Sequence, residues 1–321
     1  MRVLITGASG FIGSFILEQN YPDIIFRGAY RNESSKLESQ SSEVTIVGNI
    51  DTNTNWEESL KDVDAVIHSA GRAHIMEDKS KDSLDEYLKV NTEGTLNLAE
   101  QCLEFGVKRF LFMSTAKVNG ESSSEEKPFR ASDKPNPEDE YSTSKYYAEK
   151  GLLELSESKG LSLTIIRPGL VYGPNVKANF LSLMNLVKVR LPLPLGSINN
   201  SRSFISIYNL TDIIMRCLES PSAVNKTFLV SDDEDLSTKE LIIKMSISFG
   251  KKPLVFPFSP MIMTYFAKMI GREDLILRLC ESFRLDITET KNILNWKPVM
   301  TVEQSLIKMT ETIKENKNSV F

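Results

Sequence analysis

An apolar strand at the start of the chain runs directly into a glycine-rich turn. Val3, Leu4 and Ile5 lead into Thr6-Gly7-Ala8-Ser9-Gly10-Phe11-Ile12-Gly13, and apolar residues at helical spacing follow. Glycines let the backbone turn tightly and approach a pyrophosphate, and the first N–H groups of the following helix point toward the phosphates. Glycine spacing alone would also suit an ordinary tight turn. Because this turn stands between a strand and a helix, it predicts an α/β unit that binds a dinucleotide.

Strand-like and helical segments alternate along the first half of the chain. The strand patterns cover residues 24–30, 44–48, 65–69, 109–114 and 162–167. Such alternation is typical of an α/β fold with a doubly wound parallel sheet of the Rossmann type. The nearly continuous apolar runs at 65–67 and 110–113 predict strands that are buried on both faces.

The sequence changes in character after residue 174. A proline-broken loop at 191–196 is followed by helical patterns and short strand patterns. We therefore expect a cofactor-binding domain over residues 1–172 and a smaller C-terminal α/β domain, mainly for the substrate, over residues 173–321.

Composition and charge exclude several classes of protein. The net charge of -5 argues against a nucleic-acid-binding surface. No apolar run reaches the roughly 20 residues of a membrane span. The first apolar stretch is already explained as a strand rather than a signal peptide, so we expect a cytoplasmic protein. The two histidines, His68 and His74, lack the spacing of metal ligands, and we predict no metal site.

A tyrosine and a lysine stand four residues apart at Tyr141 and Lys145. On a helix both side chains share one face. A free phenol titrates near ~10, and a nearby cation lowers its pKa by stabilising the phenolate. An exposed helical Tyr–Lys pair is common by itself, but the glycine turn upstream favours the interpretation of Tyr141 as a catalytic base.

Together these motifs resemble the extended short-chain dehydrogenase/reductase family, in particular its nucleotide-sugar epimerases and reductases. Residues 6–13 fit the family pattern TGxxGxxG, and Tyr141 and Lys145 fit YxxxK. The further matching segments, in family order, are Ser69-Ala70-Gly71, Asn91-Thr92-Glu93-Gly94-Thr95, Ser114-Thr115, Arg167-Pro168-Gly169 and Val171-Tyr172-Gly173-Pro174.

The resemblance implies a catalytic set and a cofactor site. Thr115, Tyr141 and Lys145 would be catalytic, with Thr115 binding the reacting oxygen. Asn91 would kink its helix and connect to the lysine through water. The implied cofactor-binding residues are Gly7, Ser9, Gly10, Phe11, Ile12, Gly13, Arg31, Asn49, Ile50, Ser69, Ala70, Gly71, Asn91, Ser114, Tyr141, Lys145, Arg167 and Pro168.

The resemblance implies that the cofactor is NAD or NADP. Relatives that prefer NAD carry an acidic residue at the end of the second strand, where it binds the ribose hydroxyls. This chain has Arg31 there, which would attract a 2′-phosphate and favours NADP. Arg31 could instead stack on adenine or point to solvent.

The implied substrate is a UDP-sugar. An arginine can bind a diphosphate through paired N–H donors, which suits Arg202, although a surface arginine would look the same. The loop at 191–200 resembles a bacterial subgroup that acts on UDP-N-acetylhexosamines. The expected substrate-binding residues are His74, Thr115, Asn179, Arg202 and Arg284.

Three functions are compatible with these residues. Related 4,6-dehydratases carry Asp-Glu after the threonine, whereas this chain has Ala116-Lys117, which disfavours dehydration. We expect a UDP-(N-acetyl)hexose 4-epimerase of bacterial surface-polysaccharide sugar synthesis. The alternative is an NADPH-dependent 4-keto reductase, and a more remote one is a non-catalytic cofactor sensor. The resemblance also implies a homodimer through the helices around Asn91 and Tyr141, and a return of residues 204–218 to the first domain.

Overall fold

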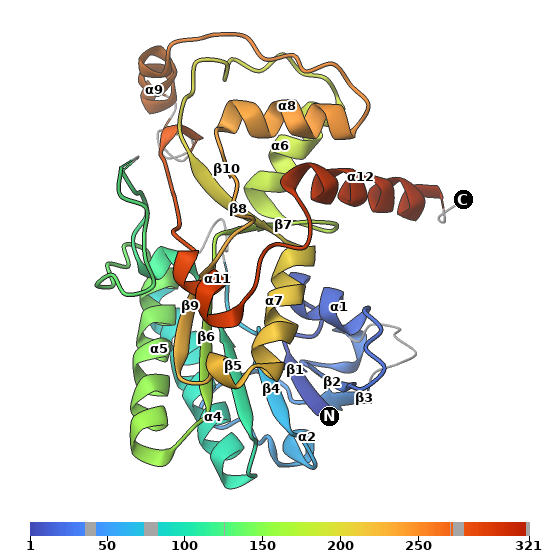
Figure 1. Ribbon diagram of the computed structural model, residues 1–321, viewed down its shortest axis with the longest axis vertical. Helices are drawn as coiled ribbons and strands as arrows, with labels where there is room; N and C mark the ends of the chain where they lie inside the picture. Colours follow the sequence, from blue (N-terminus) through green and yellow to red (C-terminus); the bar gives the residue numbers. More distant parts are fainter. Residues whose placement is uncertain (36–42, 74–82, 125, 270, 272–278, 319–321) are drawn as a thin grey trace.

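The structure is a computed structural model that describes residues 1–35, 43–73, 83–124, 126–269, 271 and 279–318. Its first domain is built on a seven-stranded sheet in the order β3-β2-β1-β4-β5-β6-β9, with every neighbouring pair parallel (Figure 1). The strands are β1 (Arg2–Thr6), β2 (Ile25–Tyr30), β3 (Glu43–Ile46), β4 (Ala65–His68), β5 (Arg109–Met113), β6 (Leu163–Pro168) and β9 (Lys226–Val230). The expected Rossmann-type fold is confirmed.

Helices cover both faces of this sheet, and each face has its own core. On β1, Val3 and Ile5 pack under the helices of one face, whereas Leu4 packs under those of the other. The first face carries α1 (Phe11–Leu17), α7 (Ile207–Glu219) and α11 (Thr288–Leu294). The second carries α2 (Glu57–Leu60), α4 (Gly94–Glu104) and α5 (Glu140–Lys159). Burial on both faces explains the nearly continuous apolar strands.

The order of the strands reverses between β1 and β4. A parallel sheet opens a crevice for ligands at the carboxyl ends of the strands at such a reversal. The turns that follow the two strands touch there, because a Cβ atom built on Gly7 would lie 2.8 Å from the backbone nitrogen of Ala70. Gly7 also has φ +68°, a conformation that favours glycine.

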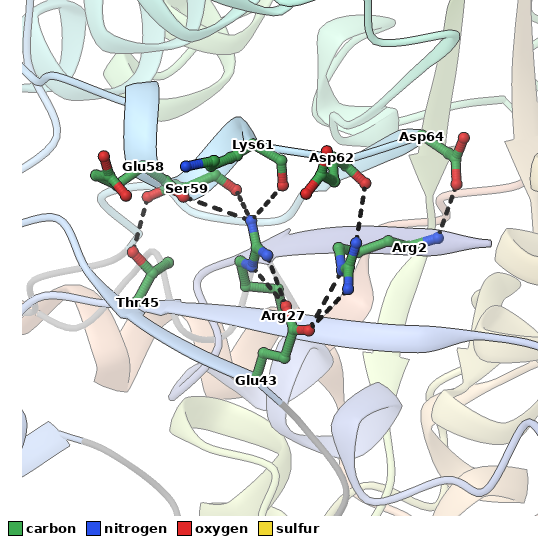
Figure 2. A network of polar contacts seen from close by, with 9 residues as sticks. All are labelled: Arg2, Arg27, Glu43, Thr45, Glu58, Ser59, Lys61, Asp62 and Asp64. Carbon is green, nitrogen blue, oxygen red and sulfur yellow. Dashed lines mark hydrogen bonds and ion pairs between the residues drawn. The ribbon is translucent and has the colours of Figure 1, made fainter.

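A polar network connects β1, β2 and β3 near the amino ends of the strands, opposite the crevice (Figure 2). Glu43 at the start of β3 forms ion pairs with Arg27, at 2.7 Å, and with Arg2, at 3.1 Å. Arg27 also donates to the backbone oxygens of Ser59 and Lys61, each at 2.9 Å, at the end of α2. The network therefore joins three strands and a helix on the side away from the crevice.

A separate three-stranded sheet has the order β10-β8-β7, and this sheet with the helices around it is called the second domain below. Its strands are β7 (Leu170–Tyr172), β8 (Arg202–Ser206) and β10 (Asp235–Leu236), and its helices are α6 (Ala178–Lys188), α8 (Thr238–Ser248), α9 (Pro260–Met269) and α12 (Val302–Asn318). A separate apolar core joins these helices to Tyr172 and Phe204. Helix α7, within the 204–218 stretch, instead packs in the core of the first domain. Within the described ranges, no helix is long and apolar enough to cross a membrane.

We predict that Gly13→Ala destabilises the protein, because the new Cβ atom would lie 2.3 Å from the backbone oxygen of Gly7. The turn cannot move freely between β1 and Ala70, so we expect a loss of about 1–3 kcal/mol in the free energy of unfolding. Urea denaturation measures this loss. Ser14→Ala, the next position on α1, is the matched control and should change it by less than about 0.5 kcal/mol. Equal stability of the two variants would contradict the prediction.

Candidate active site

Helix α5 carries Tyr141 and Lys145, and its start is set by Asp139. The Asp139 carboxylate accepts a hydrogen bond from the backbone N–H of Ser142 at 2.6 Å, in a capping box with the Ser142 side chain. The helix ends at Gly160, which has the left-handed conformation (φ 77°) typical of a helix C-terminus.

Lys145 lies beneath the crevice with 2% of its surface exposed. Its Nζ donates to the backbone oxygen of Met113 at 3.0 Å and lies 4.6 Å from the centre of the Phe112 ring. Burial lowers the pKa of Lys145 to about 8, although the nearby Glu149 carboxylate raises it. A Cβ atom built on Gly71 would lie 3.2 Å from this Nζ, so a side chain at residue 71 would crowd the lysine from that side.

Tyr141 is partly buried and meets the ring of Tyr87 edge-on, with the ring centres 6.5 Å apart. Burial raises the pKa of Tyr141 to about 12, and the charges of Asp139 and Tyr87 raise it further. The expected lowering by Lys145 was therefore wrong for the protein alone. The phenolate loses more by leaving water than it gains from an ammonium that is bound to Met113.

Asn91 lies in a π-helical stretch, Leu88–Glu93, that joins α3 (Ser83–Tyr87) to α4. Its Oδ1 accepts from the backbone N–H of Arg72 at 2.7 Å, and its Nδ2 donates to Ser144 Oγ at 2.9 Å. A Cβ atom on Gly71 would lie 3.1 Å from that Oδ1. The side chains of Asn91 and Lys145 thus both lie against Gly71. π-Helical turns are frequent at functional sites.

Glu149 and Arg167 form a buried ion pair that sequence reasoning missed. They are 2% and 5% exposed, and Arg167 Nε donates to Glu149 at 2.9 Å. Glu149 also accepts from Ser114 Oγ, and Arg167 Nη1 donates to Asn119 at 3.0 Å. Because the Arg167 guanidinium is engaged in this way, a cofactor contact at residues 167–168 would use the backbone. In the sequence, Glu149 lies four residues after Lys145 and therefore on the same face of the helix, and this spacing could have identified Glu149 as a site residue.

Lys117 joins the end of β5 to the start of α5. It follows Thr115 in a short 3-10 helix, Ala116–Val118, and its Nζ lies 2.6 Å from both Asp139 and Glu121. The Thr115 hydroxyl accepts from the Lys117 N–H at 3.3 Å. A hydroxyl that accepts can still donate to a substrate oxygen. These contacts hold Thr115 beside the start of α5, the helix that carries Tyr141 and Lys145.

His68, the last residue of β4, lies buried between two threonines. Its Nε2 is 2.8 Å from Thr95 Oγ1, and its Nδ1 is 2.6 Å from Thr6 Oγ1. The Thr95 hydroxyl donates to the Asn91 backbone oxygen at 2.7 Å, so it accepts from His68, and Nε2 carries the proton. Thr6 then donates to Nδ1. Burial, with a contribution from the charge of Lys145, lowers the pKa of His68 to about 3.

The glycine turn fits a dinucleotide. Gly13 and Gly7 are packed too closely for any side chain, and Gly10 precedes α1 in an extended conformation. Ser69 Oγ donates to the Thr6 backbone oxygen at 2.6 Å, which fixes the second turn beside the first. The outer expected residues Ser9, Arg31 and Asn49 are exposed, whereas Phe11, Ile12 and Ile50 are partly buried.

Two of the expected substrate residues lie together in the second domain. Arg202, at the start of β8, is bridged to Phe283, the neighbour of Arg284. Arg202 Nη1 donates to the Glu281 backbone oxygen at 3.1 Å, and Arg284 Nε forms an ion pair with Asp235 at 2.8 Å. Asn179 is exposed near the start of α6. His74 lies outside the described residues.

The profile of the NAD dependent epimerase/dehydratase family matches residues 3–231. The chain belongs to this family and is an enzyme, which confirms the resemblance to extended short-chain dehydrogenases/reductases. Over 319 residues it is 41% identical to a UDP-glucose 4-epimerase of Vibrio cholerae, and the match covers 98% of this chain and 96% of the relative.

Solved structures share the fold. A UDP-glucose 4-epimerase of Thermotoga maritima, in a structure with UDP-glucose, superposes with a TM-score of 0.76 at 21% identity, covering 99% of this chain and 100% of that one. A UDP-N-acetylglucosamine 4-epimerase of Bacillus cereus gives a TM-score of 0.79 at 19% identity, with coverage of 98% and 99%.

We predict that His68 makes the protein sensitive to mild acid. Its pKa of about 3 in the folded protein lies below its ordinary 6.5, so stability falls as the pH drops below 6.5 toward 3. Between pH 7 and pH 5 we expect His68 to account for about 2 kcal/mol of lost stability. In His68→Gln the pH-dependent loss should be smaller by that amount, as measured by urea denaturation at both pH values. An identical loss in both proteins would refute the assignment.

Proposed function

We propose that the chain is a UDP-sugar 4-epimerase that uses NAD or NADP. The proposal is supported by the attachment of α5, which carries Tyr141 and Lys145, to the end of β5, where Thr115 follows, in a chain that is 41% identical to a UDP-glucose 4-epimerase. We further propose that the sugar is an N-acetylated hexose used in bacterial surface-polysaccharide synthesis. The resemblance of the loop at 191–200 to a subgroup that acts on UDP-N-acetylhexosamines supports this choice.

NAD or NADP, when bound, supplies the position that takes up and returns a hydride, and its oxidised ring adds positive charge. The Gly7–Gly13 turn and the Ser69–Gly71 turn would hold it. Tyr141 takes the proton from the hydroxyl on carbon 4 of the sugar, and Thr115 donates to the same oxygen. Lys145 stabilises the phenolate, and Asn91 orients the backbone of Arg72 beside it. Tyr141 returns the proton when the hydride returns to the opposite face.

Lys117 supports epimerisation over dehydration. Its ammonium lies between Asp139 and Glu121, at 2.6 Å from each. A cation in this position compensates the Asp139 charge that raises the pKa of Tyr141. Lys117 stands where related dehydratases carry a carboxyl group, and a lysine cannot replace the acid and base carboxyl groups that eliminate water.

The substrate and assembly proposals rest on the second domain and on α5. Arg202 would bind the diphosphate, Arg284 the nucleotide, and Asn179 would contact the sugar nucleotide. We propose a homodimer through α4 and α5, because Phe105, Tyr147 and Leu153 are exposed there at 42%, 47% and 41%. Residues 1–172 and 204–218 would form the cofactor domain together with β9 and α11, which belong to the seven-stranded sheet and its core, in a cytoplasmic enzyme.

We predict that the purified protein converts UDP-glucose or UDP-N-acetylglucosamine to its carbon-4 epimer with only a catalytic amount of cofactor. An epimerase returns its hydride, so no net reductant is needed. NMR of the sugar follows the conversion. Tyr141→Phe should retain the fold and lose at least about 100-fold in turnover, because only the proton acceptor is removed.

In a parallel reaction the protein is given a UDP-4-keto-6-deoxy sugar and NADPH, and the consumption of NADPH is followed by the absorbance of the reduced nicotinamide. Rapid NADPH loss there, with no epimer in the first reaction, would replace the epimerase with the 4-keto reductase. Full turnover in Tyr141→Phe would exclude the proposed base in either enzyme.

We predict that Arg31 selects the cofactor. The residue follows β2 directly and is exposed, so its guanidinium can reach a 2′-phosphate. Arg31→Asp should weaken NADP binding by at least tenfold and strengthen NAD binding, because a carboxylate repels the phosphate and accepts from ribose hydroxyls. Fluorescence titration with both cofactors measures the change, with Lys61→Glu as a control for net charge. Equal affinities in wild type and Arg31→Asp would make Arg31 a bystander.

A further inference from the structure

Helix α9 is apolar on both of its faces although it lies on the surface. Met263 and Ala267, one turn apart, are buried, and Met263 packs in the core of the second domain. Met261 and Met269 point away from that core and are 82% and 69% exposed. A helix that is apolar all round is normally buried all round. The outer face of α9 therefore exposes two methionines to water, and Lys268 is the charged residue beside them.

The exposed apolar surface continues beyond α9. Leu254, Phe256 and Phe258, in the segment before the helix, are all exposed. This segment is hydrogen-bonded to the loop after α6, because Leu193 N–H donates to Leu254 O at 2.9 Å and Phe256 N–H donates to Leu193 O at 3.0 Å. Figure 1 shows α6, α8 and α9 at the end of the molecule away from the seven-stranded sheet, with this segment running along that end.

The end of α6 adds apolar and basic residues to the same region. Val189 is 73% exposed, and Arg190 shares a small surface hollow with Leu191, Lys252 and Leu254. We call the exposed apolar residues of 189–191, 254–258 and α9, together with the basic residues Lys188, Arg190, Lys251, Lys252 and Lys268 beside them, the apical face.

The apical face is built from segments without acidic residues. Residues 178–211 and 241–272 contain no Asp or Glu, although the chain has 43 acidic residues and a net charge of -5. These segments therefore give a basic, apolar surface to an acidic protein. A basic surface of this kind matches negative charge on a partner.

We propose that the apical face docks on the surface of a membrane that carries anionic lipids. Exposed Met, Phe and Tyr side chains would enter the boundary between headgroups and acyl chains, and the lysines and arginine would contact lipid phosphates. A second copy of the chain is disfavoured as the occupant, because both copies would bring the same positive charge to the interface. Tyr141 and Lys145 lie on α5, which packs on the seven-stranded sheet, whereas α9 lies at the end of the molecule away from that sheet (Figure 1), so we expect docking to leave the catalytic residues unaffected.

The experiment measures co-sedimentation of the purified full chain with vesicles of phosphatidylcholine alone or mixed with phosphatidylglycerol. We expect binding to the mixed vesicles that weakens as salt is raised. Met261→Ser with Met269→Ser, and separately Arg190→Glu with Lys252→Glu, should each reduce this binding at least tenfold. The matched controls are Ile25→Ser with Val299→Ser, which are exposed apolar residues elsewhere, and Lys61→Glu with Lys226→Glu.

Circular dichroism and epimerisation of soluble UDP-sugar should be unchanged in both apical pairs, which separates docking from folding and from catalysis. Absence of binding, equal binding to both kinds of vesicle, or equal losses in the control pairs would overturn the proposal. A smaller oligomer by light scattering in the methionine pair, without vesicle binding by the wild type, would assign the apical face to a second copy and overturn it as well.

Discussion

The buried ion pair of Glu149 and Arg167 is the interaction on which the candidate site depends. It joins α5 to the end of β6, reaches Ser114 at the end of β5, and reaches Asn119 in the loop that follows. Removing one partner of such a pair leaves an uncompensated buried charge and costs about 3–5 kcal/mol. Because Glu149 lies one turn after Lys145, the same pair that stabilises the domain also sets the position of the catalytic helix.

A second buried network connects the cofactor side of the crevice to that helix. Thr6, the last residue of β1, is hydrogen-bonded to His68, His68 to Thr95, and Thr95 to the backbone oxygen of Asn91. Asn91 in turn binds Ser144 on α5. The glycine turn and the Tyr–Lys helix are thus linked by uncharged hydrogen bonds. A neutral His68 is required, since its two nitrogens have opposite roles in the network.

The charges of the protein alone do not lower the pKa of Tyr141, so this part of catalysis would depend on the bound cofactor. Burial is the largest cause of the shifts that raise the pKa of Tyr141 to about 12 and lower that of Lys145 to about 8. The two shifts have the same cause, since burial disfavours the phenolate and the ammonium alike. Lys117 counters the charge of Asp139, and further positive charge near Tyr141 would have to come with the cofactor. The phenolate of Tyr141 would then form mainly when the cofactor is bound.

The order strand, glycine turn and helix, with YxxxK downstream, determined the Rossmann-type sheet, the family and the catalytic candidates, because these depend on local backbone geometry and on spacing along one helix. Tertiary structure alone decided the buried partners of Arg167, the protonation of His68 and the direction of the pKa shift of Tyr141. It also brought Arg202 beside residue 283 and placed the apolar residues of α9 on the surface. These properties depend on burial and on contacts between residues far apart in the chain, which spacing in the sequence does not encode.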